Sequence, residues 1–334
     1  MIRIYQAGDE IGINTLYEKV FGKKRSLQEW QWKFETFPES AVIVVSEEDG
    51  YINGHAAFLK IHARHNGKDI ALGERVDIMV DPDAQGRGIY KQIVERMMEE
   101  CVAEQIDILY GFPAETAKQV FLKVAGGSEL GNVPRFLAVN KPGALLASKL
   151  GPLKAIQMPV DRLFSVSIPK KSPYQLREMN ERLELADVIY SRFEKQYPLH
   201  AKRGSEYVRR RYLAHPSKDY RVYALELNGY AEAYCVLHDE TQDNGVMFTT
   251  IVDLFGANDE AAIVSQLKAI RRFTQADALN CWAVPDSARY RALKKAGFFH
   301  INSPMPFVIK DFTGSGDYDQ LTNWHLSQSD VDSY

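Results

Sequence analysis

The sequence predicts an α/β protein of mixed α+β character, with a mixed sheet and two similar domains in tandem. Three observations predict this: the length, the alternation of strand-like and helix-like segments, and a partial internal repeat. At about 100–200 residues per domain, 334 residues correspond to two domains. We expect a first domain over 1–140, a connector over 141–172, a second domain over 173–312 and a C-terminal tail over 313–334 that lies at the surface.

Apolar periodicity and turn residues place the elements of the first half. Helices are expected at Asp9–Phe21 and at Ser26–Phe37, where Pro38 stops the second one. Strands are expected at Ile2–Tyr5, Ala41–Ser46, Asn53–His62, Val76–Val80 and Ile106–Tyr110. Asn66-Gly67 is typical of a hairpin tip.

A strand, a glycine-containing loop and a helix follow one another in the middle of this half. The strand over Val76–Val80 ends at Asp81-Pro82, the loop is Gln85–Gly88, and an amphipathic helix begins at Ile89. A further helix is expected at Thr116–Val124, before Gly126-Gly127. An apolar stretch at Leu145–Ile156 indicates one helix in the connector.

The second half repeats features of the first in the same order, at an offset of about 175 residues. The matched pairs are Trp32-Lys33-Phe34 with Arg210-Arg211-Tyr212, Asn53-Gly54 with Asn228-Gly229, Asp77 with Asp253, and Gly126 with Gly297. Similar order at a nearly constant offset favours a duplication.

Composition excludes several classes of function. The net charge of -3 gives no global field that favours nucleic acid, and we read Arg209–Arg211 as a solvated helix face. No apolar run approaches the ~20 residues of a membrane span. The three cysteines form no CxxC pair, and we expect a cytoplasmic protein without a metal site.

The loop and the start of its helix have the properties of an anion site. A helix N-terminus presents unpaired backbone N–H groups and a partial positive charge. Gly86 and Gly88 allow close approach, and Arg87 and Lys91 add charge, so a pyrophosphate fits best. The Walker spacing is absent, and a Rossmann fingerprint would need glycine where Lys91 stands. A tight turn without a ligand is the alternative.

At these residues the sequence resembles a known family. The segment VDIMVDPDAQGRGIYKQIVERM is similar to the acyl-CoA-binding motif of the GNAT superfamily of N-acetyltransferases, Gln/Arg-x-x-Gly-x-Gly/Ala. Gln85 and Gly88 match its first two fixed positions, whereas Tyr90 departs from the third. A bulky residue there is familiar in proteins with two such domains in tandem. The order of elements over 1–138 also resembles that family.

The resemblance implies an acyl-CoA site, with acetyl-CoA as the expected co-substrate. The strand would pair with the pantetheine arm, and backbone N–H groups of the loop would hold the pyrophosphate. The residues that it implies are Ile78, Met79, Val80, Gln85, Gly86, Arg87, Gly88, Ile89, Tyr90 and Lys91. The thioester carbonyl would lie where this strand diverges from the one over Ile106–Tyr110.

Transfer of an acyl group to an amine needs a base for the amine proton, and an acid can protonate the leaving thiolate. Glu74 lies eleven residues before Gln85, which matches the spacing of the base glutamate in histone acetyltransferases of the superfamily. Asp77 is the second candidate. The stretch Val120–Lys123 lacks the tyrosine acid of many relatives, so Tyr110 is the candidate substitute.

The second half lacks the loop, since Ala257–Glu260 is acidic, and we expect a degenerate GNAT-like domain that shapes the acceptor pocket. Asp330 and Asp332 of the tail are candidates for contact with an amino substrate, and a frayed tail is the alternative.

The expected function is an acetyl-CoA-dependent N-acyltransferase acting on a small-molecule amine or amino sugar. One alternative is a non-catalytic acyl-CoA-binding or regulatory protein, which the missing tyrosine favours, together with the absence of an asparagine common in the family after the second strand, where Ala114 follows Pro113. Another is an aminoacyl transferase of the peptidoglycan-bridge type, which uses charged tRNA. The phosphate loop and the lack of a basic stripe argue against that alternative.

Overall fold

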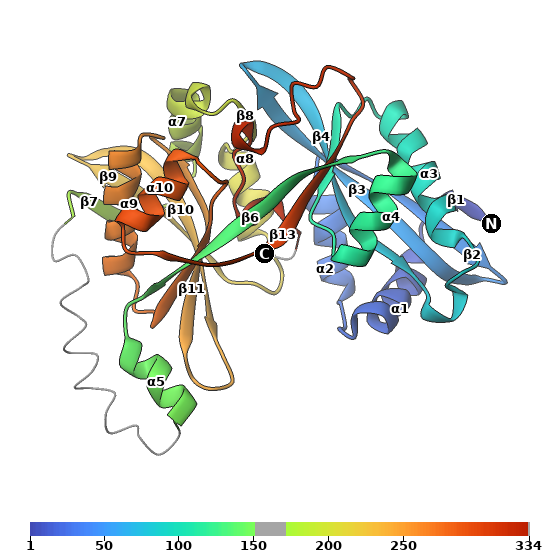
Figure 1. Cartoon of the computed structure of the whole chain (residues 1–334), viewed down its shortest axis with the longest axis horizontal. Helices are drawn as coiled ribbons and strands as arrows, with labels where there is room; N and C mark the ends of the chain where they lie inside the picture. Colours follow the sequence, from blue (N-terminus) through green and yellow to red (C-terminus); the bar gives the residue numbers. More distant parts are fainter. Residues whose placement is uncertain (151–171, 333–334) are drawn as a thin grey trace.

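A twisted sheet runs through the whole chain, and helices cover both of its faces (Figure 1). The computed structural model describes residues 1–150 and 172–332. Within these residues the sheet has 13 strands in the order β1-β2-β3-β4-β5-β13-β6-β12-β11-β10-β9-β7, and β8 pairs with β3. No helix in the described parts of the chain is long and apolar enough to cross a membrane.

Each half contains one series of strands and helices. The first series is β1 (Ile2–Ile4), α1 (Asp9–Phe21), α2 (Leu27–Gln31), β2 (Ser40–Glu48), β3 (Tyr51–His65), β4 (Lys68–Val80), α3 (Ile89–Ala103), β5 (Ile108–Gly111), α4 (Glu115–Ala125), β6 (Ser128–Val139) and α5 (Pro142–Leu150). The second series is β7 (Tyr174–Glu178), α7 (Glu184–Phe193), β8 (Leu199–Ala201), α8 (Ser205–Val208), β9 (Tyr220–Leu227), β10 (Tyr230–Thr241), β11 (Met247–Gly256), α9 (Glu260–Phe273), β12 (Ala278–Trp282), α10 (Ala288–Lys295) and β13 (Phe299–Asp311).

Most elements expected in the first half are present. The helix expected over Asp9–Phe21 is α1, and the strands expected over Ala41–Ser46 and Asn53–His62 are longer in the structure, as β2 and β3. The helix expected over Ser26–Phe37 is divided: α2, capped by Ser26, is followed by a π-helical turn, Trp32–Thr36. Strand β6 was not expected, because its Gly131 and Pro134 interrupt the apolar alternation.

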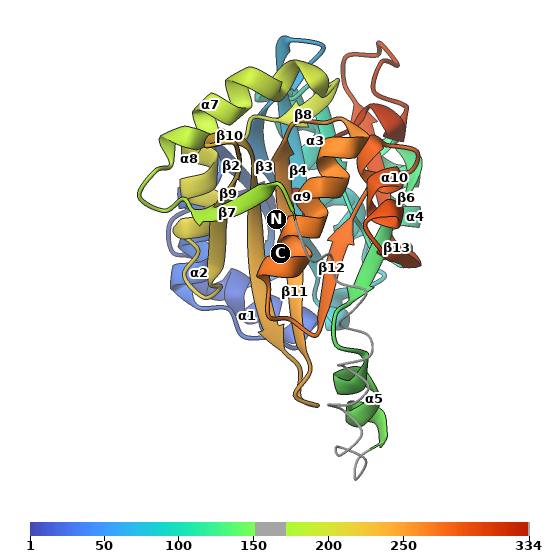
Figure 2. The ribbon, with the colours of Figure 1, turned by 90° about the vertical axis from the view of Figure 1, so that its left-hand side faces the viewer.

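The connector is only partly described. Its helix α5 lies apart from the sheet (Figure 2). The helix expected over Leu145–Ile156 begins within α5 and runs into 151–171, which lies outside the described residues. The proposed domain bounds, 1–140 and 173–312, remain a proposal.

The halves are joined by an exchange of their last strands. Strand β13, from the end of the chain, lies between β5 and β6 of the first half and is antiparallel to both. Strand β6 in turn pairs with β12 of the second half. Figure 1 shows β6 and β13 crossing between the halves. The two halves therefore share one hydrogen-bonded sheet.

The structure supports the internal repeat and corrects one of its matches. Both halves contain a π-helical turn, Trp32–Thr36 and Arg209–Leu213, and Gly126 and Gly297 both follow a helix with positive φ. The match of Asn53-Gly54 with Asn228-Gly229 is wrong, because the former lies within β3 and the latter is the turn between β9 and β10. The equivalent turn is Asp49-Gly50, between β2 and β3, with the same positive φ values of about 50° and 80°.

The helices of the first half pack on opposite faces of its strands. Helices α1 and α2 cover the face that carries Ile43, Leu72 and Val76. Helices α3 and α4 cover the other face, with Phe58 and Leu109. In the second half, α9 and α10 lie on one face and α7 and α8 on the other (Figure 2).

The expectation of a surface tail is wrong for its last residues. Leu321 and Trp324 join the core of the first half, and Ser327–Val331 is buried between the halves. Arg211 is also buried, in contrast to the solvated helix face expected for Arg209–Arg211. Its guanidinium donates to the backbone carbonyls of Ser329 and Val331. Arg203 and Arg211 are buried cations of the second half, and oxygen atoms of the tail accept their hydrogen bonds. These bonds hold the tail in place, because a buried charge without partners is costly.

Each half has a buried arginine–aspartate pair at the same place. Arg25 pairs with Asp77 of β4, and Arg203 pairs with Asp253 of β11 at 2.9 Å. The tail adds a carboxylate to the second pair, since Asp330 lies 2.6 Å from Arg203. These side chains are almost fully buried, so removal of one partner leaves an uncompensated charge.

Phe307→Ala tests the shared strand. Phe307 is fully buried in β13 and packs against Phe112 and Trp324 at ring distances of 5.0 and 4.9 Å. We expect the free energy of unfolding to fall by about 3–5 kcal/mol. Chemical denaturation followed by tryptophan fluorescence and circular dichroism measures this. Phe299→Ala, on the same strand but 52% exposed, should change it by less than about 0.5 kcal/mol. Two separate transitions, of which only one shifts, would contradict a shared sheet.

Arg203→Met tests the buried ion pair at the tail. We expect a loss of about 3–5 kcal/mol at neutral pH, because two buried carboxylates lose their cation. Burial already raises the pKa of Asp330. A carboxyl group with a raised pKa in the folded state binds protons preferentially there, so the loss should shrink as pH falls.

The control for Arg203→Met is Arg192→Met. The Arg192 side chain is 53% exposed and pairs only at the surface with Glu232. We expect this variant to change the free energy of unfolding little at any pH. An equal loss in both variants would show that the effect is not specific to the buried pair.

Candidate functional site

The loop between β4 and α3 is built from two glycines and a short turn. Pro82–Ala84 forms a 3-10 turn, and Lys19 of α1 holds Asp81 and Asp83 at 2.7 and 2.6 Å. Gly86 and Gly88 have φ of +78° and +80°, where a side chain is strained. A Cβ on Gly86 would have no heavy atom within 4 Å. A Cβ on Gly88 would meet only the Gln92 side-chain nitrogen, at 3.7 Å, so the loop is open at Gly86 and has one flexible neighbour at Gly88.

The N-terminus of α3 is open as well. Its N-cap is Gly88, no side chain caps it, and its first turn contains no acidic residue. The backbone N–H groups of the first turn therefore remain free for an anion. Helix α9, at the same position in the second half, differs: the Asp259 side chain accepts from the backbone N–H of Ala262 at 2.9 Å. That terminus is closed by its own carboxylate.

The two cations expected beside the loop are exposed and weakly held. The Arg87 side chain is 53% exposed and pairs with Glu48, and Lys91 is 3.7 Å from Glu95. Surface ion pairs of this kind contribute little to stability, so both cations can turn toward a bound anion at low cost.

Strand β4 has one free edge next to the loop. It pairs with β3 along most of its length, but with β5 only from Leu72 to Glu74. Beyond Glu74, no described strand pairs with its other edge, which carries Ile78, Met79 and Val80. Backbone N–H and C=O groups on this edge are available to an extended ligand.

Glu74 and Tyr110 lie side by side where β4 and β5 diverge. They form the last register pair of the two strands and are 3% and 1% exposed. Burial raises the pKa of Glu74 well above its ordinary value, and Asp332 acts in the same direction, against Arg211 and Lys33. Burial also raises the pKa of the Tyr110 phenol, with Glu74 next in effect. The structure thus brings both together at the point of divergence.

Asp77 lies in a bulge of β4, and its carboxylate is held by two cations. Its φ is +47°, and its side chain contacts Arg25 and Lys33, the latter at 2.7 Å. Burial acts to raise the pKa of Asp77, but Lys33 and Arg25 outweigh it and the pKa is lowered. The charged form is thus strongly favoured, which suits an anchor for Lys33 better than a base.

Several residues at the site were missed in the sequence. Lys33 lies between Asp77 and Asp332, 2.6 Å from the latter, and Arg211 lies near Glu74. Asp330 contacts Arg203 instead of an open pocket. The internal repeat was the one feature of the sequence that could have indicated Lys33 and Arg211, because it aligns these two residues.

A cavity of about 440 Å³ lies between the halves, on the face of the first-half strands that α1 and α2 cover. Its lining includes Phe37, Pro38, Glu39, Lys60, Ile61, His62, Asp187, Tyr190, Lys202, Gly204, Glu206, Tyr207 and Arg210. Tyr207 joins it to the buried centre, since its ring meets Phe37 and its hydroxyl lies 3.4 Å from the Ser329 hydroxyl.

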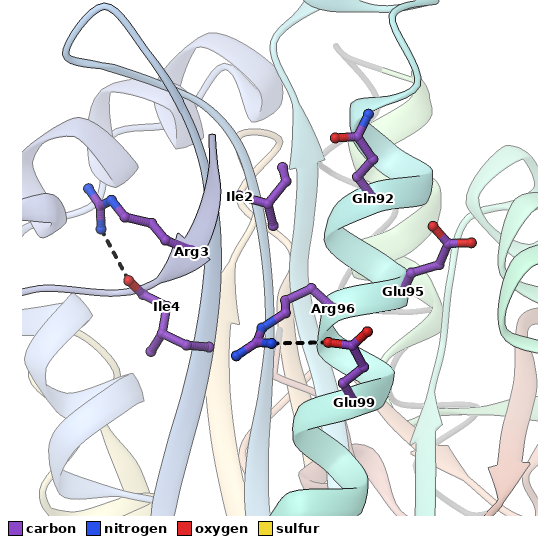
Figure 3. A pocket seen from close by; sticks show the side chains of 7 residues that line it. All are labelled: Ile2, Arg3, Ile4, Gln92, Glu95, Arg96 and Glu99. Atoms are coloured by element: carbon purple, nitrogen blue, oxygen red, sulfur yellow. Dashed lines mark hydrogen bonds and ion pairs between the residues drawn. The ribbon is translucent and has the colours of Figure 1, made fainter.

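A second cavity, of about 600 Å³, lies between β1 and α3 (Figure 3). It is lined by Ile2, Arg3, Ile4, Gln92, Glu95, Arg96 and Glu99. Its arginines are paired with Asp9 and Glu99 at 2.6 and 3.0 Å. None of the expected site residues lines it.

The comparisons with known proteins agree with this geometry. Residues 1–118 match the sequence profile of the family described as Acetyltransferase (GNAT) domain. No curated protein matched the sequence. A solved GCN5-related N-acetyltransferase from Anabaena variabilis superposes with a TM-score of 0.65 at 12% identity, over 93% of this chain and 73% of that chain.

Two further solved structures are similar. A protein of unknown function from Enterococcus faecalis, described as a probable N-acyltransferase, has a TM-score of 0.65 at 10% identity, over 97% of this chain and 73% of that chain. N-myristoyltransferase from Saccharomyces cerevisiae, with bound myristoyl-CoA, has a TM-score of 0.60 at 9% identity, over 92% of this chain and 82% of that chain. At these identities the similarity shows the fold alone.

The family match and the fold confirm two of the expectations from sequence, the GNAT resemblance and the tandem mixed α/β architecture. The GNAT family uses acyl-CoA as co-substrate and acylates amines. Residues 1–118 are therefore a GNAT acetyltransferase domain, and the second half repeats the order of its strands and helices.

Proposed function

We propose that the protein transfers an acetyl group from acetyl-CoA to the amino group of a small molecule, such as an amino sugar. One observation carries the proposal. The open N-terminus of α3 lies at one end of the free edge of β4, and Glu74 lies at the other end. An anion site, an extended backbone edge and a buried carboxyl group thus follow one another along one strand.

The residues on this path fit an acyl-CoA. Backbone N–H groups from Gly86 to Tyr90 would hold the pyrophosphate, with Ile89 in the first turn of α3, and Arg87 and Lys91 would add charge. Gln85 precedes the glycines in extended conformation. The edge at Ile78–Val80 would pair with the amide groups of the pantetheine arm.

The cavity between the halves suits an amine acceptor. Tyr190 and Tyr207 provide aromatic faces on which a sugar ring can pack, and Glu39, Asp187 and Glu206 supply negative charge. Lys60, Lys202 and Arg210 also line the cavity and balance this charge, so the carboxylates would act as hydrogen-bond acceptors that orient the amine and hydroxyl groups of an acceptor. The cavity lies on the face of the sheet covered by α1 and α2, whereas α3 lies on the other face, so a donor at the loop and an acceptor in the cavity would not compete for space.

Glu74 is proposed as the base. The amine must lose a proton as its nitrogen bonds to the acyl carbon, and a carboxylate at the divergence of β4 and β5 can accept it. Because burial raises the pKa of Glu74, its conjugate acid forms more readily than that of an exposed glutamate. Asp77 is the second candidate, and here we assign it to holding Lys33.

The donor site is tested by titration of acetyl-CoA into the wild-type protein and Gly88→Trp, followed by calorimetry. We expect binding to be lost in the variant, because an indole at Gly88 covers the open N-terminus of α3. Gly67→Trp is the matched control, since Gly67 has a similar φ of +79° at the tip between β3 and β4. Equal affinity in all three proteins, or no binding by the wild type, would contradict the proposed site.

Glu74→Gln tests the base. With an amine that supports release of CoA thiol, we expect kcat to fall about 10²–10⁴-fold. In the wild type, kcat/KM should rise with pH through an apparent pKa above the ordinary ~4.3 of glutamate, because the base must be deprotonated. This rise should be absent in the variant.

The stability of Glu74→Gln gives a second readout. A carboxyl group with a raised folded pKa stabilises the protein fully below its unfolded pKa and less as pH rises. The glutamine of the variant does not titrate, so its free energy of unfolding does not decrease with pH in this way. We therefore expect the variant to be at least as stable as the wild type at neutral pH. Glu95→Gln, at the exposed surface of α3, serves as the control. Full activity of Glu74→Gln would exclude Glu74 as the base, and thiol release with no amine tested would favour a non-catalytic role.

A further inference from the structure

Glu74 is followed by an arginine that points to the opposite face of the sheet. Glu74 has Lys33 and Arg211 among its charged neighbours, on the face covered by α1 and α2. The Arg75 guanidinium instead lies over the ring of Phe121 in α4, 4.3 Å from its centre. Successive residues of a strand point to opposite faces. One strand therefore presents a carboxyl group to the acceptor face and a cation to the face of the CoA loop.

The side chain of Arg75 is held across the divergence of β4 and β5. Its stem passes over Gly111, the last residue of β5, where a Cβ would come within 2.3 Å of the Arg75 Cγ. A side chain at position 111 would therefore have to displace the stem of Arg75. The guanidinium ends between α3 and α4, the two helices on the same side of β4 in Figure 1.

The guanidinium is buried with few partners. Arg75 is 9% exposed, and its Nε has no hydrogen-bond partner in the described structure. Its one side-chain hydrogen bond goes to the Tyr90 hydroxyl and is long, at 3.5 Å. Buried arginine is rare without a carboxylate partner, and its charge cannot be lost at physiological pH. Such a group favours the arrival of a negative charge.

Two of the positions at which the sequence departs from the GNAT pattern contact Arg75. Tyr90 replaces the glycine or alanine of the motif, and its hydroxyl reaches Arg75 and the Ala117 carbonyl. Phe121 lies in the stretch of α4 where many relatives carry a tyrosine acid, and it stacks with the Arg75 guanidinium. Tyr90 and Phe121 thus both help to position this cation.

We propose that Arg75 replaces the general acid by stabilising the negative charge that develops on the sulfur of CoA. The inference rests on the proposed acetyl transfer. The amine nitrogen bonds to the acyl carbon, the carbon–sulfur bond breaks, and its electron pair stays on sulfur. Glu74 takes the amine proton, and the thiolate beside Arg75 later takes a proton from water. The products are the amide and CoA thiol.

Tyr110 is less suited to this role. It shares the face of Glu74 and packs against Phe307 and Trp324, whereas α3 and its loop lie on the other face. A cation on the side of the loop is the group that the departing sulfur meets. Fixed charges of this kind, aimed at the atom where charge develops, are an effective form of catalysis.

The experiment measures the pKa of the CoA thiol bound to the protein, and needs no acceptor. Thiolate absorbance is followed by ultraviolet difference spectroscopy against pH, with S-methyl-CoA as the blank. In the wild type we expect the pKa of the bound thiol to lie about 1–3 units below that of free CoA. Arg75→Met, which fills a similar volume without charge, should abolish this lowering. Arg75→Lys should keep much of it.

The outcomes separate this inference from the proposed function. If the wild type does not bind CoA, the proposed function itself is wrong. If it binds CoA and the thiol pKa is equal in the wild type and Arg75→Met, only the role of Arg75 is overturned. If Arg75→Met no longer binds CoA, the pKa of the bound thiol is measured in Gly111→Ala instead, because the added methyl group displaces the Arg75 stem. An unchanged thiol pKa in that variant overturns the inference, and a raised one supports it.

Discussion

The buried pairing of an arginine with a strand aspartate, made once in each half, is the interaction on which the rest of the structure depends. Arg25 with Asp77 and Arg203 with Asp253 place unscreened charges in the interior, and each pair needs further partners. The C-terminal tail meets this need by placing Asp330 beside Arg203 and Asp332 beside Lys33. The tail is thereby fixed between the halves, and its carboxylates become part of the electrostatic surroundings of Glu74.

Duplication produced two similar units, but their helix termini give them different chemistry. In the first half, Gly88 leaves the N-terminus of α3 open. In the second half, Asp259 closes the N-terminus of α9 with its own side chain, and Glu260 pairs with Arg291 and Lys295. The open terminus is the one at which we propose that the phosphate groups of the donor bind. The second unit instead contributes Arg211 and Tyr207 to the face opposite the loop, where the acceptor is proposed to bind.

The sheet itself divides the site into two compartments. Where β4 and β5 part after Glu74 and Tyr110, the alternation of side chains sends Glu74 to one face and Arg75 to the other. A carboxyl group and a cation are thus adjacent in the sequence, yet they lie in separate environments with different neighbours. The exchange of β6 and β13 encloses β5 between β4 and β13, so the strand beside the point of divergence comes from the far end of the chain.

The sequence alone was sufficient for the local features: the β4–loop–α3 segment, the glycines at 86 and 88, the spacing of Glu74, and the repeat that relates Asp77 to Asp253. Each depends on residues close together in the chain or on similarity of order, and such patterns survive without knowledge of the fold. The tertiary structure decided the position of β13 between β5 and β6, the burial of Asp330 and Arg211, and the stacking of Arg75 on Phe121. These contacts join segments far apart in the chain, and no local preference encodes them, because they arise only when the two halves close their sheet and their buried charges must find partners.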